Sequence, residues 1–476
     1  MMRISEIYIR NYLQFRDFHL DLTDPDTGEP LEKVCFIGAN GTGKSTLLKI
    51  IFTCIAHIDK NHHEAVKPKL TIEDFPFMAV VYFLIKNETG SIYVLILRGN
   101  CYYYSDTDWN DFIHEQLLNL NIAGLEEWWH KPFESKNNPL LIEKFLYPAN
   151  TLYPGRNRDL VCYAQSDKTS LVRKPRSLGI NNKKSFDLPV INLNQSIKLF
   201  ELFPLYHDVS WSNVEDFWRI LIYQIKKREG DYLKFLEFPE NQNLTISEVR
   251  AKFDRKNPEI LVKLAEQWNL ILEKAGLEFD VENAKIPVQL TENLEAYIRL
   301  RETKQNIPYN SLSTGIRNFI FQLGHIYALY FNRDIQRGFL LIDEPELSLF
   351  PDLLYDIIDR YLSIIQNTQF FVATHSPIIA AQFAPTERFI LEFDDEGYVT
   401  ARLGVSPEGD DPNDLLTNDF VVRSLYGKKG IEQWERYLEL RRKIVETDDK
   451  EAKKELLKEY SRIGNAYNFL PNEISE

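Results

Sequence analysis

Residues 33–52, KVCFIGANGTGKSTLLKIIF, constrain the fold of this chain more than any other stretch. The apolar run 34–37 is typical of a buried strand, and residues 46–52 have the apolar spacing of a buried helix. Between them, GANGTGKS fits the pattern G-x-x-x-x-G-K-[ST]. Glycines in such a loop let successive backbone N–H groups surround phosphate oxygens, and the helix adds its positive N-terminal end. A chance glycine-rich turn is rare in this strand–loop–helix context, so we expect the chain to bind a nucleoside triphosphate.

The residues predicted to bind the nucleotide all lie in this loop or at the start of the helix after it. They are Gly38, Asn40, Gly41, Gly43, Lys44, Ser45 and Thr46. The Lys44 ammonium is expected to reach the β- and γ-phosphates, and the Ser45 hydroxyl to hold Mg²⁺.

The composition describes a globular protein larger than one ordinary domain. With 476 residues we expect one large domain with insertions, or two domains. The net charge of -14 argues against a strongly basic nucleic-acid coat. Four scattered cysteines indicate reduced thiols in the cytoplasm. We see no signal-peptide core and no apolar run of about 20 residues, so no membrane partner is expected.

The N-terminal third has the alternation of β-structure. Residues 3–22 predict two strands joined by a short turn, and residues 79–104 predict two β-rich runs around a hairpin turn at 87–90. The polar residues 60–76 predict a surface crossing. A group of histidines with one glutamate lies nearby but matches no zinc signature, so we expect a solvated loop. These residues are His57, His62, His63 and Glu64.

Residues 156–184 are strongly basic, although the chain as a whole is acidic. The stretch contains Pro175 and Gly179, which predict a loop. It either contacts nucleic acid or is a solvated charged face, and the sequence leaves both open. Its basic residues are Arg156, Arg158, Lys168, Arg173, Lys174, Arg176, Lys183 and Lys184.

The middle of the chain predicts a compact helical insertion. A capping box at 212–215 precedes one helix, and a second helix is expected over 258–276. Short strands are expected at 279–281, 287–290 and 296–300. No heptad pattern lasts over several repeats, which excludes a long coiled-coil arm.

Three further motifs follow within about 65 residues. Residues 312–317, LSTGIR, precede a helix-like apolar run. The apolar strand 339–342 ends in Asp343 and Glu344, so that Asp343 can complete the Mg²⁺ shell and Glu344 can polarise an attacking water. The apolar strand 370–373 is followed by His375, which can hydrogen-bond the γ-phosphate.

The order of these four motifs resembles the ABC-type ATPase heads of the RecF and SMC class over about residues 1–165 and 306–404. The resemblance implies an α/β fold: a mixed sheet with flanking helices, an antiparallel β subdomain, and a helical insertion at 166–305. It implies that ATP is sandwiched between two copies, with Ser313 and Gly315 touching the partner's γ-phosphate. It also gives Glu344 and His375 catalytic roles and suggests Gln165 as a further metal ligand. Residues 348–351 depart from the family's D-loop pattern.

Residues 405–476 are expected to form a helical segment, with helices at 431–444 and 450–463. Trp434, Tyr437, Leu438 and Ile444 form an apolar stripe that either docks a partner or packs on the head itself. Stand-alone heads of this build resemble ATPase subunits of Septu-, retron- and PARIS-type antiphage systems. We therefore expect a slow ATPase that controls a separate nuclease or toxin. The alternatives are a RecF-like DNA repair or replication ATPase and a nucleotide-binding interaction module with low turnover.

Overall fold

The computed structural model describes most of the two ATPase lobes and the C-terminal helices. The described ranges are 3–58, 81–87, 90–97, 100–104, 159–164, 206–209, 214–280, 298–307, 311–331, 335, 337–422 and 424–469. They belong to two compact units, Met1–Gly409 and Asp410–Glu476, which we describe separately.

A seven-stranded sheet forms the centre of the first unit, in the order β14-β13-β3-β12-β11-β7-β8. All neighbouring strands are parallel except the edge pair β13 and β14. Parallel strands are covered on both faces, which explains why their sequences are almost continuously apolar. One of them, β8, comes from the stretch expected to be an insertion. The strands are β3 (Lys33–Gly38), β7 (Asp159–Ala164), β8 (Tyr206–Asp208), β11 (Arg337–Asp343), β12 (Thr368–Ala373), β13 (Arg388–Phe393) and β14 (Val399–Leu403).

A second, antiparallel sheet of five strands has the order β2-β1-β4-β5-β6. The two strands expected in residues 3–22 and the hairpin centred on 87–90 are confirmed. The β-rich run after that hairpin is two strands rather than one, because β5 and β6 pair antiparallel with Leu97 opposite Asn100. The strands are β1 (Arg3–Tyr12), β2 (Phe15–Asp21), β4 (Val81–Asn87), β5 (Gly90–Leu97) and β6 (Asn100–Tyr104).

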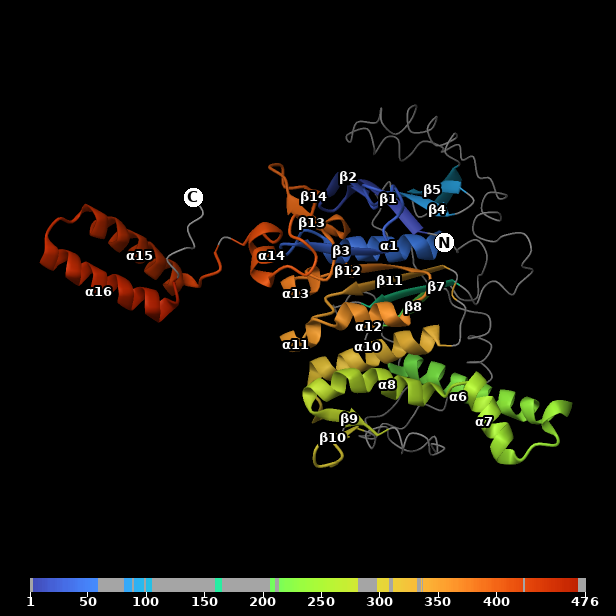
Figure 1. Ribbon diagram of the computed structural model, residues 1–476. Coiled ribbons are helices and arrows are strands. Elements are labelled where there is room, and N and C mark those ends of the chain that lie inside the picture. The colour runs from blue at the N-terminus through green and yellow to red at the C-terminus, as the bar shows by residue number, and fades with distance from the viewer. Residues whose placement is uncertain are drawn as a thin grey trace, which may run out of the picture. The chain divides into compact units, whose positions relative to one another are not determined.

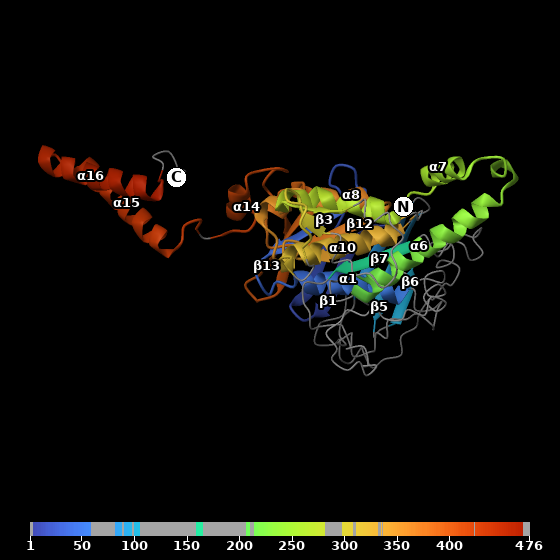
Figure 2. The same ribbon diagram turned by 90° about the horizontal axis from the view of Figure 1, so that it is seen from below.

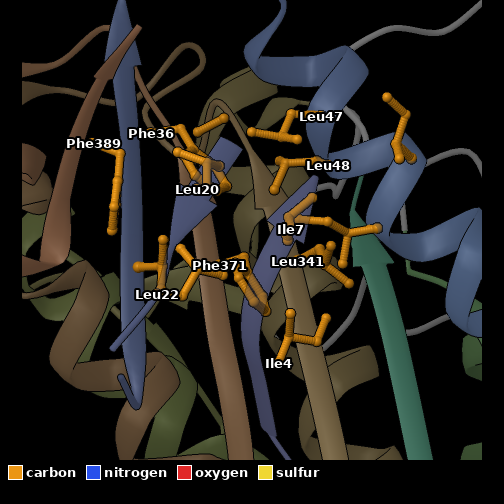
Figure 3. Packing of buried hydrophobic residues seen from close by; sticks show 14 of the residues in the cluster. Ile4, Ile7, Leu20, Leu22, Phe36, Leu47, Leu48, Leu341, Phe371 and Phe389 are labelled. Atoms are coloured by element: carbon orange, nitrogen blue, oxygen red, sulfur yellow. The ribbon is translucent and has the colours of Figure 1, made fainter. Parts of the chain in front are cut away.

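Helix α1 (Lys44–Ile58) packs in the hydrophobic core shared by the two sheets. Ile7 of β1, Leu48 of α1 and Phe371 of β12 all belong to that core and are fully buried (Figure 3). The Gln369 side chain of β12 also joins the sheets, because it accepts the Ile4 N–H and donates to the Ile4 carbonyl, each at 2.8 Å. The core therefore fixes the start of α1 against the ends of β11 and β12.

The other face of the main sheet is covered by a layer of helices (Figure 1). Tyr361 of α12 packs on Phe370 of β12 and on Phe319 of α10, and Trp268 of α8 donates to the Ile320 carbonyl at 3.0 Å. The helices of this layer are α6 (Val214–Leu236), α8 (Ile260–Leu272), α10 (Thr314–Tyr330) and α12 (Ile357–Ile364), whereas α7 (Ile246–Lys256) packs on the end of α6 away from the sheet (Figure 1). Short elements complete the unit: α11 (Pro351–Leu354), α13 (Pro377–Ala380), η6 (Pro239–Asn241), η7 (Glu273–Ala275) and η10 (Pro385–Glu387).

Helix α7 was not predicted from the sequence. Thr245 and Glu248 form its capping box, and Val249 and Phe253 pack with Phe235 near the end of α6. Figure 2 shows α7 beside that end of α6. The capping-box pattern, followed by apolar residues at 246, 249 and 253 with helical spacing, was the available sequence signal. The capping box expected at 212–215 starts outside the described residues, but α6 is present.

One strand differs slightly from the prediction, and another lies where it was expected. The strand expected at 279–281 is β9 (Leu277–Phe279), and it pairs with β10 (Ile298–Leu300), which lies within the range expected for a strand at 296–300. Strand β9 starts earlier because Gly276, with φ 71°, ends the preceding helix in the left-handed conformation and lets the chain extend at once. The strand expected at 287–290 lies outside the described residues.

The second unit contains α14 (Pro412–Asn418), α15 (Lys428–Glu446) and α16 (Lys450–Tyr467). Asp411 caps α14 by accepting the Asn413 N–H at 2.8 Å, and the sequence analysis did not predict this short helix. The apolar stripe of α15 has a cover within this unit that was not predicted: Tyr437 stacks on Tyr460 of α16, and both Tyr437 and Trp434 contact Phe469. None of the helices in the described parts of the chain is long and apolar enough to cross a membrane.

Candidate nucleotide-binding site

At two positions of the loop between β3 and α1, both the backbone conformation and the close surroundings require glycine. Gly38 and Gly43 have φ values of 150° and 89°. A Cβ atom on Gly38 would lie 2.3 Å from the Leu391 carbonyl oxygen, and one on Gly43 would lie 2.2 Å from Gln14 Nε2. The Leu391 backbone and the Gln14 side chain therefore approach the loop closely, which leaves no room for a side chain at either glycine.

Lys44 lies at the first position of α1 and its side chain turns back over the loop. Its Nζ donates to the carbonyl oxygens of Gly38 at 2.9 Å and Ala39 at 3.1 Å. Burial lowers the pKa of Lys44, while the nearby charges of Asp343 and Glu344 act in the opposite direction. The ammonium is thus held at the loop that we expect to carry phosphates.

Ser45 and Asp343 meet although 298 residues separate them in sequence. Ser45 Oγ donates to Asp343 Oδ1 at 3.0 Å. Strand β11 lies two positions from β3 in the parallel sheet, so the end of β11 faces the start of α1. Hydroxyl and carboxylate oxygens are the ligands that Mg²⁺ prefers, so this pair fits the metal expected there. Gln165, the other expected ligand, lies outside the described residues.

Glu344 and His375 follow neighbouring strands and face each other. His375 Nε2 lies 3.9 Å from Glu344 Oε1. Glu344 has a φ of 51°, uncommon for a residue with a side chain and typical of functional sites, and its N–H donates to the Ala373 carbonyl at 2.8 Å. Burial and the positive charge of Lys44 lower the pKa of His375, which favours a neutral imidazole at neutral pH.

The signature residues lie at the start of α10. Ser313 is exposed and caps the helix by accepting the Ile316 N–H at 3.4 Å. Gly315 is buried, and the atoms nearest to a Cβ on it belong to Ser348 and Leu349, not to the phosphate loop. The signature is therefore built against residues 348–351, the segment that departs from the D-loop pattern.

The structure brings five of the predicted site residues to one end of the main sheet: Lys44, Ser45, Asp343, Glu344 and His375. Among the other predicted residues, Asn40 and Gly41 are exposed in the loop, and Thr46 is half-buried in α1.

Two residues that contact this site were not predicted. Gln14, in the turn between β1 and β2, donates to the Gly41 carbonyl at 3.3 Å, and nothing in the sequence indicated this contact. Glu346 accepts the backbone N–H of His375 at 2.7 Å. Its position one residue beyond the Asp-Glu-Pro segment was the available signal.

Several other residues singled out from the sequence lie outside the described ranges. This holds for the basic residues of 156–184 and for His62, His63 and Glu64, whereas His57 lies in α1. Within the ranges that are described, no three His, Cys, Asp or Glu side chains gather in a way that could hold a metal ion.

Comparison with known proteins identifies one family. Residues 2–380 match the family described as AAA ATPase domain. No curated protein matches the chain.

Solved structures with a similar arrangement share little sequence with this chain. One is described as the SmcHead bound to the C-winged helix domain of ScpA, with 12% identity, a TM-score of 0.38, and coverage of 84% of this chain and 97% of that one. Another is an Smc head domain with an extended coiled coil, bound to the C-terminal domain of ScpA and derived from Pyrococcus furiosus, with 13% identity, a TM-score of 0.36, and coverage of 85% and 96%. The SMC head domain from Thermotoga maritima also has 13% identity and a TM-score of 0.36, with coverage of 85% and 100%.

Proposed function

Because this chain belongs to the AAA ATPase domain family, we propose that it hydrolyses ATP slowly at the end of β3 and uses the cycle to control a separate effector protein. The observation that carries the first part is the pairing of Ser45 with Asp343 at 3.0 Å beside the buried Lys44. It brings an ammonium, a hydroxyl and a carboxylate from separate elements to one loop, which is the set that a triphosphate with its metal needs.

Each side chain then has a defined task. Lys44 binds phosphate oxygens of the substrate ATP, and the backbone N–H groups of the loop bind others. A Mg²⁺ ion held by Ser45 and Asp343 would neutralise charge on the phosphates. Glu344 accepts the proton of the water that attacks the γ-phosphorus, and His375, neutral because its pKa is lowered, orients that water or a γ-phosphate oxygen.

The first experiment compares nucleotide binding and turnover in three variants. Lys44→Ala should lose ATP binding because the cation facing the phosphates is removed. Glu344→Gln should bind ATP but lose turnover, because an amide cannot accept the proton. Glu396→Gln, at an exposed glutamate paired with Arg16, is the matched control and should behave as wild type. Full turnover in Glu344→Gln would show that the catalytic assignment is wrong.

We further propose that two copies close around ATP, with Ser313 and Gly315 of one copy facing the γ-phosphate held by the other. The support is the exposed Ser313 hydroxyl at a helix start, together with the placement of Gly315 against Ser348 rather than the chain's own phosphate loop. Ser313→Arg should leave ATP binding intact, abolish turnover and prevent the ATP-dependent increase in molar mass measured by light scattering. Thr245→Arg, which also removes a helix cap, is the control for lost capping.

The effector is proposed to be a nuclease or toxin of an antiphage system, and the support is the family resemblance of the motif order. Co-purification of the full chain with the product of a neighbouring gene, in ATP and in ADP, tests this role. A complex that forms or dissociates with the nucleotide state would support it. Absence of any complex, together with salt-sensitive binding of DNA, would favour the DNA-repair alternative.

A further inference from the structure

The site contains a third carboxylate, Glu346, to which the mechanism above assigns no task. It lies on the turn after β11, two residues beyond Glu344, and its side chain points toward the turn after β12. Its Oε1 accepts the His375 N–H at 2.7 Å. A second hydrogen bond lies beside this link, since the Glu344 N–H donates to the carbonyl of Ala373, the last residue of β12, at 2.8 Å.

The environment of Glu346 makes a carboxylate costly at this position. Burial and the nearby negative charge of Glu344 raise its pKa. The hydrogen bonds from the backbone N–H groups of His375 and Glu346 and from the Thr374 hydroxyl only partly oppose this. Burying a charged group costs stability unless its hydrogen bonds compensate fully, and such costs are concentrated at functional sites.

We propose that Glu346 is a positioning residue for ATP hydrolysis. This inference rests on the proposed function. Glu346 holds the backbone at His375, and the imidazole carried by that residue lies 3.9 Å from Glu344 Oε1. The carboxylate thereby sets the separation of the proposed base and the proposed γ-phosphate-binding histidine without touching the substrate itself.

The test compares Glu346→Ala with Glu346→Gln. Alanine removes the acceptor, so His375 loses its fixed place; we expect kcat to fall by about 10- to 100-fold with nucleotide affinity unchanged. The carbonyl oxygen of glutamine accepts the same N–H, so Glu346→Gln should recover most of the turnover. Hydrogen exchange of the peptide containing His375 should be faster in Glu346→Ala than in wild type and in Glu346→Gln.

Glu387 provides a closely matched control at the opposite end of the sheet, just before β13. It is also a carboxylate whose pKa burial raises, and it accepts a backbone N–H, that of Ala384, at 2.7 Å, although it additionally pairs with Lys33 at 3.1 Å. Glu387→Ala should lower the melting temperature without changing kcat. Equal loss of kcat in Glu387→Ala and Glu346→Ala would mean that general destabilisation is the cause, which overturns the inference.

The remaining outcomes separate this inference from the proposed function. If Glu346→Gln is as inactive as Glu346→Ala, the carboxylate itself acts in the chemistry and the positioning role is wrong. If wild type does not hydrolyse ATP, the proposed function fails. Amide exchange at His375 is independent of turnover, and equal exchange in all three proteins would overturn the inference in either case.

Discussion

Gly315→Ala tests how the signature motif is built. Gly315 is the second residue of α10, and a Cβ at this position would lie 1.8 Å from the Ser348 carbonyl oxygen and 2.4 Å from its carbon. Both atoms are backbone, so no side chain can rotate away. The methyl group fits only if the contact lengthens to at least 3.0 Å, which displaces the backbone of residues 348 and 349.

Two terms set the expected change in the free energy of unfolding. Overpacking of a buried contact costs about 1–3 kcal/mol. Replacing glycine by alanine in a helix gains up to about 1 kcal/mol. Gly230→Ala in α6 isolates the second term, because a Cβ there meets no atom within 4 Å. Gly315→Ala should therefore be less stable than Gly230→Ala by about 1–3 kcal/mol in urea or thermal denaturation.

The displacement should also affect catalysis. The Leu347 N–H donates to the Glu344 carbonyl at 3.1 Å, and the Leu349 N–H donates to the Glu346 carbonyl at 3.0 Å, so a shift of this segment reaches the proposed base. We expect a lower kcat in Gly315→Ala and an unchanged kcat in Gly230→Ala. Equal stability and equal turnover in the two variants would refute the reasoning.

Three further predictions concern the loop, the core and the C-terminal helices. Gly43→Ala should weaken binding of a fluorescent ATP analogue, because the alanine Cβ would lie 2.2 Å from Gln14 Nε2. Gly397→Ala is the control: Gly397 also has a positive φ but no atom lies within 4 Å of its Cβ position, so binding of the analogue should not change. Burial lowers the pKa of His325 to about 3, so below pH 6.5 the unfolded state binds this proton more readily than the folded state. The free energy of unfolding should therefore decrease as the pH is lowered below 6.5, by up to about 1.4 kcal/mol per pH unit. In denaturant titrations His325→Gln should reduce this dependence on pH, and an unchanged dependence would contradict the role given to His325. Trp434→Ala should destabilise the second unit by about 1–3 kcal/mol, which is less than the loss of a fully buried tryptophan would cost, because Trp434 is half-buried. ATP turnover should not change, and a melting curve equal to that of wild type would contradict this prediction.

The sequence by itself determined the parts of this protein that depend on neighbouring residues. The glycines and Lys44 of residues 38–46 predicted the loop and the helix after it, because local backbone freedom and apolar spacing suffice to specify a strand–loop–helix unit. The same applies to the strands β11, which ends at Asp343, and β12, which His375 follows, as expected.

The tertiary structure decided which of these residues meet. Ser45 reaches Asp343 only because β12 lies between β3 and β11 in the sheet, and strand order is not encoded in any local pattern. The link from Glu346 to His375 depends on the same pairing, since it joins the turns after two strands that the sequence separates by the helices α11 and α12. The apolar stripe of α15 combines both kinds of information. Its spacing predicted an apolar face that must pack against another surface, but only the tertiary structure shows that α16 and Phe469 form that surface.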